Sequence, residues 1–287
     1  MDTKTLKVVL SAQRTELTEH FIYLRLAERC SDPKNAGVLR KISEQELIHA
    51  RFWETKTGVK VSPDKFRIAR TVFFARILGL TFVLKLMEKR EGTGSKLYKQ
   101  LALSFPEAGN FVLEESQHES KILGMLDEER LRYVGSIVLG LNDALVELTG
   151  ALAGFTLALG DTRLISLAGL VTGISASMSM AASDYLSSRA EGDPRARKSA
   201  VYTGISYLFT VILLILPFLL LSGKFIALGI TLATAVFIIF CFNYYLSVAK
   251  DLNFRNRFAE MTLISLGVAT LSFFIGYVLK SVLGVEV

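Results

Sequence analysis

The sequence predicts an all-α protein with a four-helix bundle over residues 1–125 and a five-helix transmembrane domain over residues 126–287. The first observation is composition: 51% hydrophobic residues and a mean hydropathy of +0.40 are too apolar for two soluble domains. The second is that the long uncharged apolar runs all follow residue 132, whereas all three histidines precede residue 119. The third is the helical spacing of Leu10, Leu17 and Leu24 in the first part. The two parts are therefore expected to lie in different solvents.

The formal net charge of +6 does not indicate nucleic-acid binding. The basic residues after residue 132 cluster in short loops between apolar runs, which is a membrane-topology signal and not a DNA-binding stripe. Cys30 and Cys241 lie one in each part and predict neither CxxC chemistry nor a disulfide framework. The N-terminus lacks the apolar core of a signal peptide, so the first part is expected to stay in the cytoplasm.

Residues that begin and end helices divide the first part into four helical stretches. The Asp-Pro pair at residues 32–33 is typical of an N-cap followed by proline at the first helical position, and the Ser-Pro pair at residues 62–63 repeats it. Gly58 is expected to end the second helix, and the Phe-Pro pair at residues 105–106 separates the third from the fourth. Four helices with short connections predict a bundle.

The third stretch, residues 70–90, is unusually apolar for a bundle helix. Arg76 interrupts its apolar run, which is also shorter than a membrane span. We expect this stretch to dock along the inner surface of the membrane, and the alternative is a buried helix of a dimer.

Two Glu-x-x-His motifs fall on alternate helices of the predicted bundle. They consist of Glu46 with His49 and of Glu115 with His118, and they use two of only three histidines. The i, i+3 spacing directs both side chains of a motif to one point, and di-iron bundles combine two such pairs with one Glu from each remaining helix. In each of the other helices one Glu precedes a Tyr by seven residues. The predicted ligands of two iron ions are Glu16, Glu46, His49, Glu91, Glu115 and His118.

Several alternatives to this ligand set stay open. Glu19 competes with Glu16, and Glu88 competes with the Glu of the third helix. His20 lies four residues after Glu16 and shares its helix face. Three interpretations of His20 stay open: an additional ligand, a partner of a ligand, or a solvated histidine. Glu114 and Glu119 are expected to be surface charge.

These motif residues give the first part a resemblance to the rubrerythrin and ferritin-like domains, and more closely to those fused ahead of vacuolar iron transporter domains. The resemblance implies a di-iron site. The sequence has no CxxC pair of the kind that holds the rubredoxin iron, so electron transfer through such a centre is not expected.

Five apolar segments of the second part have the roughly 20 residues that a membrane-spanning helix needs. They are expected near residues 133–158, 164–187, 200–222, 225–247 and 260–280. The second and fourth connections carry most of the Lys and Arg residues of this part, so the positive-inside rule places them, and the N-terminal domain, in the cytoplasm. An odd number of spans places the C-terminus outside.

Carboxylates inside the predicted spans indicate a functional site, because charge is costly in a bilayer. Asp143 and Glu147 are four residues apart and share a helix face, and Asp143 lies about 15 Å into its span. Met180 and Asp184 share a face of the second span. Carboxylates with a thioether suit a borderline divalent ion such as Fe²⁺ better than Mg²⁺ or Ca²⁺. Met178 is a further candidate, although a lone Met more often only packs.

The segments GLNDALVELTGALAGF and AGLVTGISASMSMAASDYLSSRAEGD, together with SLGVATLSFFIGYVLKSVLG, resemble the vacuolar iron transporter family. The resemblance covers essentially all of residues 130–285. It implies a homodimer of five-span subunits that exchange Fe²⁺, and sometimes Mn²⁺, for protons, with Asp143 and Met180 on the metal path. The sequence departs from the family at Asp184, where Glu is usual. Its connection between the second and third spans is also only about a dozen residues long, where plant members carry a long metal-binding insert.

Together these features predict an integral membrane protein that exports Fe²⁺, or Mn²⁺, from the cytoplasm in exchange for protons. The expected transport path consists of Asp143, Glu147, Met180 and Asp184, with a cytoplasmic di-iron domain that collects, oxidises or senses iron. The first alternative is a membrane-anchored di-iron peroxidase or ferroxidase, although an anchor has no use for carboxylates in mid-membrane. The second is a Mn²⁺ exporter with a regulatory metal sensor.

Overall fold

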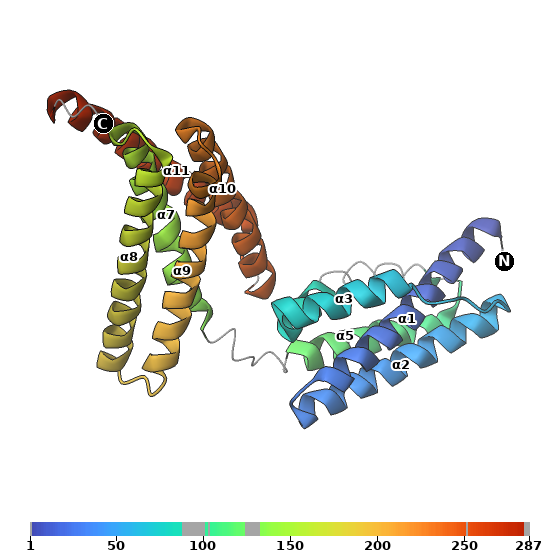
Figure 1. Cartoon of the computed structure of the whole chain (residues 1–287). Coiled ribbons are helices and arrows are strands. Elements are labelled where there is room, and N and C mark those ends of the chain that lie inside the picture. The colour runs from blue at the N-terminus through green and yellow to red at the C-terminus, as the bar shows by residue number, and fades with distance from the viewer. Residues whose placement is uncertain (1, 88–100, 103, 124–132, 251, 284–287) are drawn as a thin grey trace. The chain divides into compact units, whose positions relative to one another are not determined.

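The computed structural model describes residues 2–87, 101–102, 104–123, 133–250 and 252–283. The chain divides into two compact units, Met1–Glu128 and Glu129–Val287. Every regular element in the described residues is a helix (Figure 1), so the predicted all-α class is confirmed.

The first unit is built on a pair of long helices, α1 and α2, that pack along each other. The elements described in this unit are α1 (Thr3–Arg29), α2 (Pro33–Thr57), α3 (Lys65–Leu78), a helical segment at residues 80–87, the 3-10 turn η1 (Pro106–Ala108) and α5 (Gly109–Leu123). The Asp32 side chain accepts a hydrogen bond from the Lys34 amide, and Pro33 occupies the first turn, as predicted. Gly58 ends α2 in the left-handed conformation, with φ of 67°.

Two predictions for the third stretch were wrong. Helix α3 begins at Lys65, not directly after Ser62, because the Asp64 side chain accepts a hydrogen bond from the Arg67 amide and caps the helix. The apolar stretch is not one helix either, because it breaks at Gly79. The backbone there has φ of 95° and ψ of 158°, a conformation that side-chain-bearing residues rarely adopt.

Aromatic packing holds the helices of the first unit around a common core. Trp53 is fully buried and packs edge-on against Phe52, Phe105 and Phe111. Tyr23, likewise fully buried, lies on α1. This core fixes α2 and α5 at the level where their motif histidines lie.

The second unit consists of five long apolar helices, as predicted. They are α7 (Val134–Ala158), α8 (Thr162–Ala190), α9 (Ala196–Leu220), α10 (Lys224–Ala249) and α11 (Phe254–Leu283). Each is long and apolar enough to cross a membrane, which indicates an integral membrane protein. Helix α11 begins six residues before the expected start at residue 260, where the Asn253 side chain accepts a hydrogen bond from the Asn256 amide.

Helix α7 lies at the centre of the second unit and contacts α8, α9, α10 and α11. Its buried residues Leu145, Leu148 and Leu152 form the middle of the apolar core. Small residues allow α7 and α11 to approach closely, since a Cβ atom added at Gly276 would lie 2.6 Å from the Gly154 carbonyl oxygen. Of the two acidic side chains of α7, Asp143 is half-buried and Glu147 is exposed within one chain.

Candidate metal centre and membrane carboxylates

Three helices of the first unit bring four candidate ligands into its interior. Glu16 comes from α1, Glu46 and His49 come from α2, and His118 comes from α5. All four are buried. Residues separated by up to 102 positions in the chain thus meet because α1, α2 and α5 pack around one core.

Glu16, Glu46 and His49 form a compact group. His49 Nδ1 lies 3.5 Å from Glu16 Oε2 and 3.7 Å from Glu46 Oε2. One ligand atom from each residue lies within 4.8 Å of the others. Two carboxylates and an imidazole are donors that divalent transition-metal ions accept. This buried group could hold a metal ion.

His118 extends the group on the other side of Glu46. Its Nδ1 atom lies 3.2 Å from Glu46 Oε1, so one carboxylate oxygen faces each imidazole. Within the described part of the chain, Glu46 Oε2 and His118 Nδ1 are buried without a hydrogen-bond partner. Buried polar atoms are rarely left in this state, which favours a metal ion as their partner.

The opposite nitrogen of each imidazole is held by a second acceptor. His49 Nε2 lies 2.7 Å from Glu114 Oε2, and His118 Nε2 lies 2.9 Å from Gln45 Oε1. Because both acceptors require an Nε2–H donor, both rings turn Nδ1 toward the carboxylates. Metal-bound histidines characteristically donate their other N–H in this way.

The prediction for Glu114 was wrong, and Gln45 was not predicted to contact a histidine. Glu114 was expected to be surface charge, but its side chain is only 37% exposed and contacts His49. The signal was present in the sequence, since positions four and three residues before His118 share its helix face. Spacing alone therefore could not choose between Glu114 and Glu115.

The electrostatics of the cluster favour positive charge. Burial, reinforced by the neighbouring Glu46, raises the pKa of Glu16 to about 8. Burial on its own would lower the pKa of His49, but the neighbouring carboxylates of Glu16 and Glu46 raise it to about 11. Burial and the positive His49 lower the pKa of His118 to about 4. The two carboxylates thus hold a proton at His49, which a metal ion would displace.

The other candidates of the first unit lie apart from this cluster or outside the described residues. Glu19 forms an ion pair with Arg67 and so links α1 to α3. His20 Nδ1 donates to the Ser43 carbonyl at 2.8 Å and joins α1 to α2, so it is not a solvated histidine. Glu88, Glu91 and the side chain of Glu115 lie outside the described part of the chain.

The carboxylates of α7 lie beside a tyrosine that the sequence did not single out. Asp143 and Glu147 are one turn apart, and Asp143 is half-buried. The hydroxyl of Tyr207 on α9 donates to Glu147 Oε2 at 2.9 Å. Tyr207 is fully buried in the core of the unit. The contact of Tyr207 with Glu147 was not predicted, because an aromatic residue within an apolar run is normally expected to pack and not to bind a carboxylate.

Asp184 of α8 lies in a cluster of hydroxyl groups. Its Oδ2 atom accepts hydrogen bonds from Ser199 at 2.8 Å and Thr203 at 2.7 Å, both on α9. Ser136 of α7 joins the cluster, with its Oγ atom 2.6 Å from Ser199 Oγ. Neutral hydroxyl donors from α9 therefore hold this carboxylate, and Ser188 of α8 adds a longer contact at 3.4 Å to Asp184 Oδ1.

The two methionine candidates have different environments. Met180 is partly buried against the core of the second unit. Met178 is 70% exposed and points away from that core. Within one chain, only Met180 is placed inside the helical unit.

Comparison with known proteins supports the class of the second unit. Residues 134–197 match the model of the VIT family. The matched residues comprise α7, α8 and the beginning of α9, and thus include Asp143, Glu147, Met180 and Asp184. A comparison with curated proteins gives no significant match. The second unit is therefore a membrane unit with a VIT-family segment, whereas the ferritin-like character of the first unit stays a prediction.

Proposed function

We propose that the second unit transports Fe²⁺, or Mn²⁺, out of the cytoplasm in exchange for protons. The observation that carries this proposal is the VIT-family match, which covers the two helices that hold Asp143, Glu147, Met180 and Asp184. The VIT family suggests an iron or manganese transporter. Carboxylates in candidate membrane spans fit this function, because only a cation or proton makes them tolerable there.

The proposed path combines oxygen and sulfur ligands. Asp184, with the hydroxyls of Ser199 and Thr203, would receive the ion, and Met180 would add a softer thioether ligand. Asp143 and Glu147 would bind the ion in the span. When the ion leaves, a proton would take its place on these carboxylates, and this alternation would couple metal to proton movement.

We propose that the first unit faces the cytoplasm and the C-terminus faces outward. The connections α8–α9 and α10–α11, together with the helix ends that flank them, carry most of the basic residues of the second unit, and the positive-inside rule places this side in the cytoplasm. We also propose a homodimer, as the resemblance to the transporter family implies. The many exposed apolar side chains of the five helices could face either lipid or a second subunit.

For the first unit we propose a site for two iron ions. Glu16, Glu46, His49 and His118 would hold them, together with Glu91 and Glu115 of the predicted set. The residues fit the metal, because Glu46 directs one oxygen to each imidazole and the cluster favours positive charge. When bound, such a centre supplies oxidation of Fe²⁺ by peroxide or oxygen. The protein would collect, oxidise or sense iron there, while Glu114 and Gln45 orient the imidazoles.

The test is Fe²⁺ flux into proteoliposomes under a pH gradient. Asp143→Asn should reduce flux to the level of protein-free vesicles, whereas His49→Ala should leave flux through the spans. Asp161→Asn is the matched control, because Asp161 is an exposed helix cap and Asn caps helices equally well. Equal flux in wild type and Asp143→Asn would overturn the transport proposal.

The buried Glu16, Glu46 and His49 group also favours a second candidate, a membrane-anchored ferroxidase or peroxidase. In that case the wild-type protein would oxidise Fe²⁺ in the same vesicles without moving it across the bilayer. Loss of oxidation in His49→Ala, with no flux in any variant, would identify this function.

A further inference from the structure

Helix α3 combines a high positive charge with an exposed apolar surface. It carries four basic residues and no acidic one, and none of its residues is buried. Phe66, Phe73 and Ile77 are 74%, 57% and 52% exposed. Their spacings of seven and four residues place them on one side of the helix. A helix in a globular unit normally buries such a stripe against a neighbour, so this one requires a partner of another kind.

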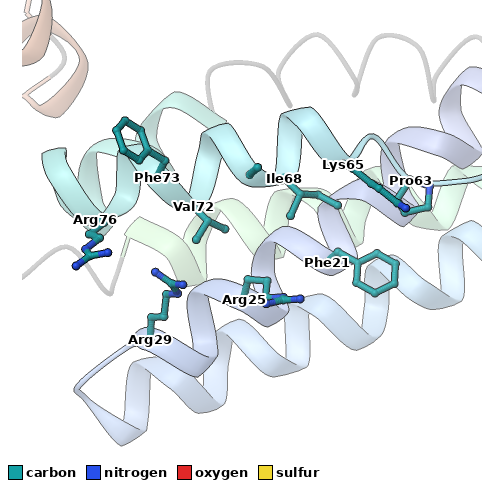
Figure 2. A pocket seen from close by; sticks show the side chains of 10 residues that line it. Phe21, Arg25, Arg29, Pro63, Lys65, Ile68, Val72, Phe73 and Arg76 are labelled. Atoms are coloured by element: carbon teal, nitrogen blue, oxygen red, sulfur yellow. The ribbon is translucent and has the colours of Figure 1, made fainter.

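A pocket of about 620 Å³ adjoins this stripe, between α3 and α1. Figure 2 shows that Ile68 and Val72 form its apolar wall on α3. The side chains of Arg25 and Arg29 extend from α1 at the same pocket, and Arg76 extends from the end of α3. The pocket thus joins an apolar wall to a basic rim.

The basic rim has no compensating charge within the described part of the unit. No described residue that lines the pocket is acidic. Arg67 of the same helix, in contrast, is neutralised by its ion pair with Glu19. Clustered arginines raise the local positive potential and attract anions. The complementary ligand is therefore an anion that also carries an apolar portion.

The connection to the second unit indicates which anion this is. The first candidate span begins at Val134, eleven residues after α5 ends at Leu123. Even fully extended, this connection reaches only about 40 Å, so a lipid surface is always within reach of the first unit. A free phosphate would satisfy the arginines and leave Phe66 and Phe73 exposed. A second α3 would place one basic helix against another.

We propose that the α1–α3 face, defined as Arg25, Arg29, Phe66, Phe73, Arg76 and Ile77, docks on anionic phospholipids of the bilayer in which the chain is embedded. The arginines contact lipid phosphates, and the apolar side chains enter the interfacial region of the bilayer. Docking holds the first unit at the membrane surface. It does not depend on metal binding or on transport.

The test is hydrogen–deuterium exchange of residues 65–78 in the full chain, embedded in nanodiscs of phosphatidylcholine with or without phosphatidylglycerol. Exchange should be slower in the anionic discs. Each basic side chain contributes about fivefold to membrane binding. Arg25→Gln with Arg76→Gln should therefore weaken lipid binding about 25-fold and remove most of the protection. Arg25→Lys with Arg76→Lys should keep it. Arg40→Gln with Lys41→Gln, an equal charge loss at exposed positions of α2, is the matched control.

A second variant tests the apolar part without altering charge. Phe66→Ser removes the most exposed aromatic side chain of the face and should weaken protection in anionic discs. Equal exchange of wild type in both disc types would overturn the proposal. Protection in lipid-free detergent that rises with protein concentration would also overturn it, in favour of a second copy. Protection by inorganic phosphate in detergent would overturn it in favour of a free anion.

Discussion

The two units surround their acidic groups with different partners. In the first unit, Glu46 lies between two imidazoles, at 3.7 Å from His49 and 3.2 Å from His118. In the second unit, Asp184 accepts hydrogen bonds from Ser199 and Thr203, and Glu147 accepts one from Tyr207. Imidazoles are themselves metal ligands, whereas hydroxyls are weak ones.

This difference in partners indicates which unit retains a metal ion and which unit lets it pass. A cluster of carboxylates and imidazoles, closed from solvent, suits an ion that stays bound. A path must bind its ion strongly enough to admit it and weakly enough to release it. Hydroxyl donors stabilise a carboxylate between binding events without a fixed positive charge. We therefore infer that the first unit holds its metal and the second passes it.

The largest expected effect follows from Glu46→Ala. Because this carboxylate faces both imidazoles, its removal should eliminate bound iron from the first unit altogether, while Fe²⁺ flux through the spans persists. Iron per chain is measured by elemental analysis, and flux is measured on the same preparation. Glu44→Ala, an exposed Glu on the same helix, should retain full iron. Undiminished iron in Glu46→Ala would remove the cluster as the metal site.

A smaller effect is expected at the partner of His49. Glu114→Gln leaves the ligands in place but replaces the charged acceptor of the His49 Nε2–H. Loss of such a partner typically weakens metal affinity by about 10-fold to 100-fold. Competition with a chelator of known affinity measures this change, and Glu107→Gln at an exposed position is the control. Unchanged affinity would show that Glu114 does not orient His49.

The stability of the metal-free first unit should depend on pH. The pKa of Glu16 is raised to about 8 and that of His49 to about 11, so the folded unit keeps protons that the unfolded chain releases. His118, with its pKa lowered to about 4, is neutral in both states above pH 6.5. Stability should therefore fall as pH rises from 6.5 to 8, by about 3 kcal/mol.

Fluorescence of Trp53, the only tryptophan, follows this unfolding. Iron-loaded protein should not lose stability in the same window, because the metal replaces the protons. Glu16→Gln should reduce the slope. A metal-free protein that becomes more stable from pH 6.5 to 8 would contradict the assigned protonation.

The smallest effect is expected in the membrane unit. Tyr207→Phe removes the hydroxyl that donates to Glu147 and leaves the buried ring in place. The loss of one hydrogen bond, about 1 kcal/mol, should reduce Fe²⁺ flux by about fivefold. Tyr202→Phe on the same helix is the control and should transport normally. A loss as complete as that expected for Asp143→Asn would contradict this minor role and place Tyr207 at the centre of the path.

The apolar runs and the caps of α2 were predictable because they depend on local sequence, whereas the start of α3 was not, because Asp64 and not Ser62 caps it. The five long helices, the Asp32 cap and the Gly58 terminus follow from composition and backbone preference. The break at Gly79 was not predicted, because an apolar run on both sides conceals a single backbone conformation. Tyr207 and Glu147 lie 60 positions apart, and no spacing rule joins residues across two helices. Glu114 was missed because two adjacent residues both share a face with His118.

The most direct test of the central claim is an anomalous difference map of iron-loaded crystals, recorded at the iron absorption edge. The claim is that buried carboxylates of the first unit are tolerated there because they hold iron. It predicts anomalous density among Glu16, Glu46, His49 and His118, and none beside Glu19 or His20. Crystals that bind iron elsewhere, with no density between Glu46 and the two imidazoles, would contradict the claim.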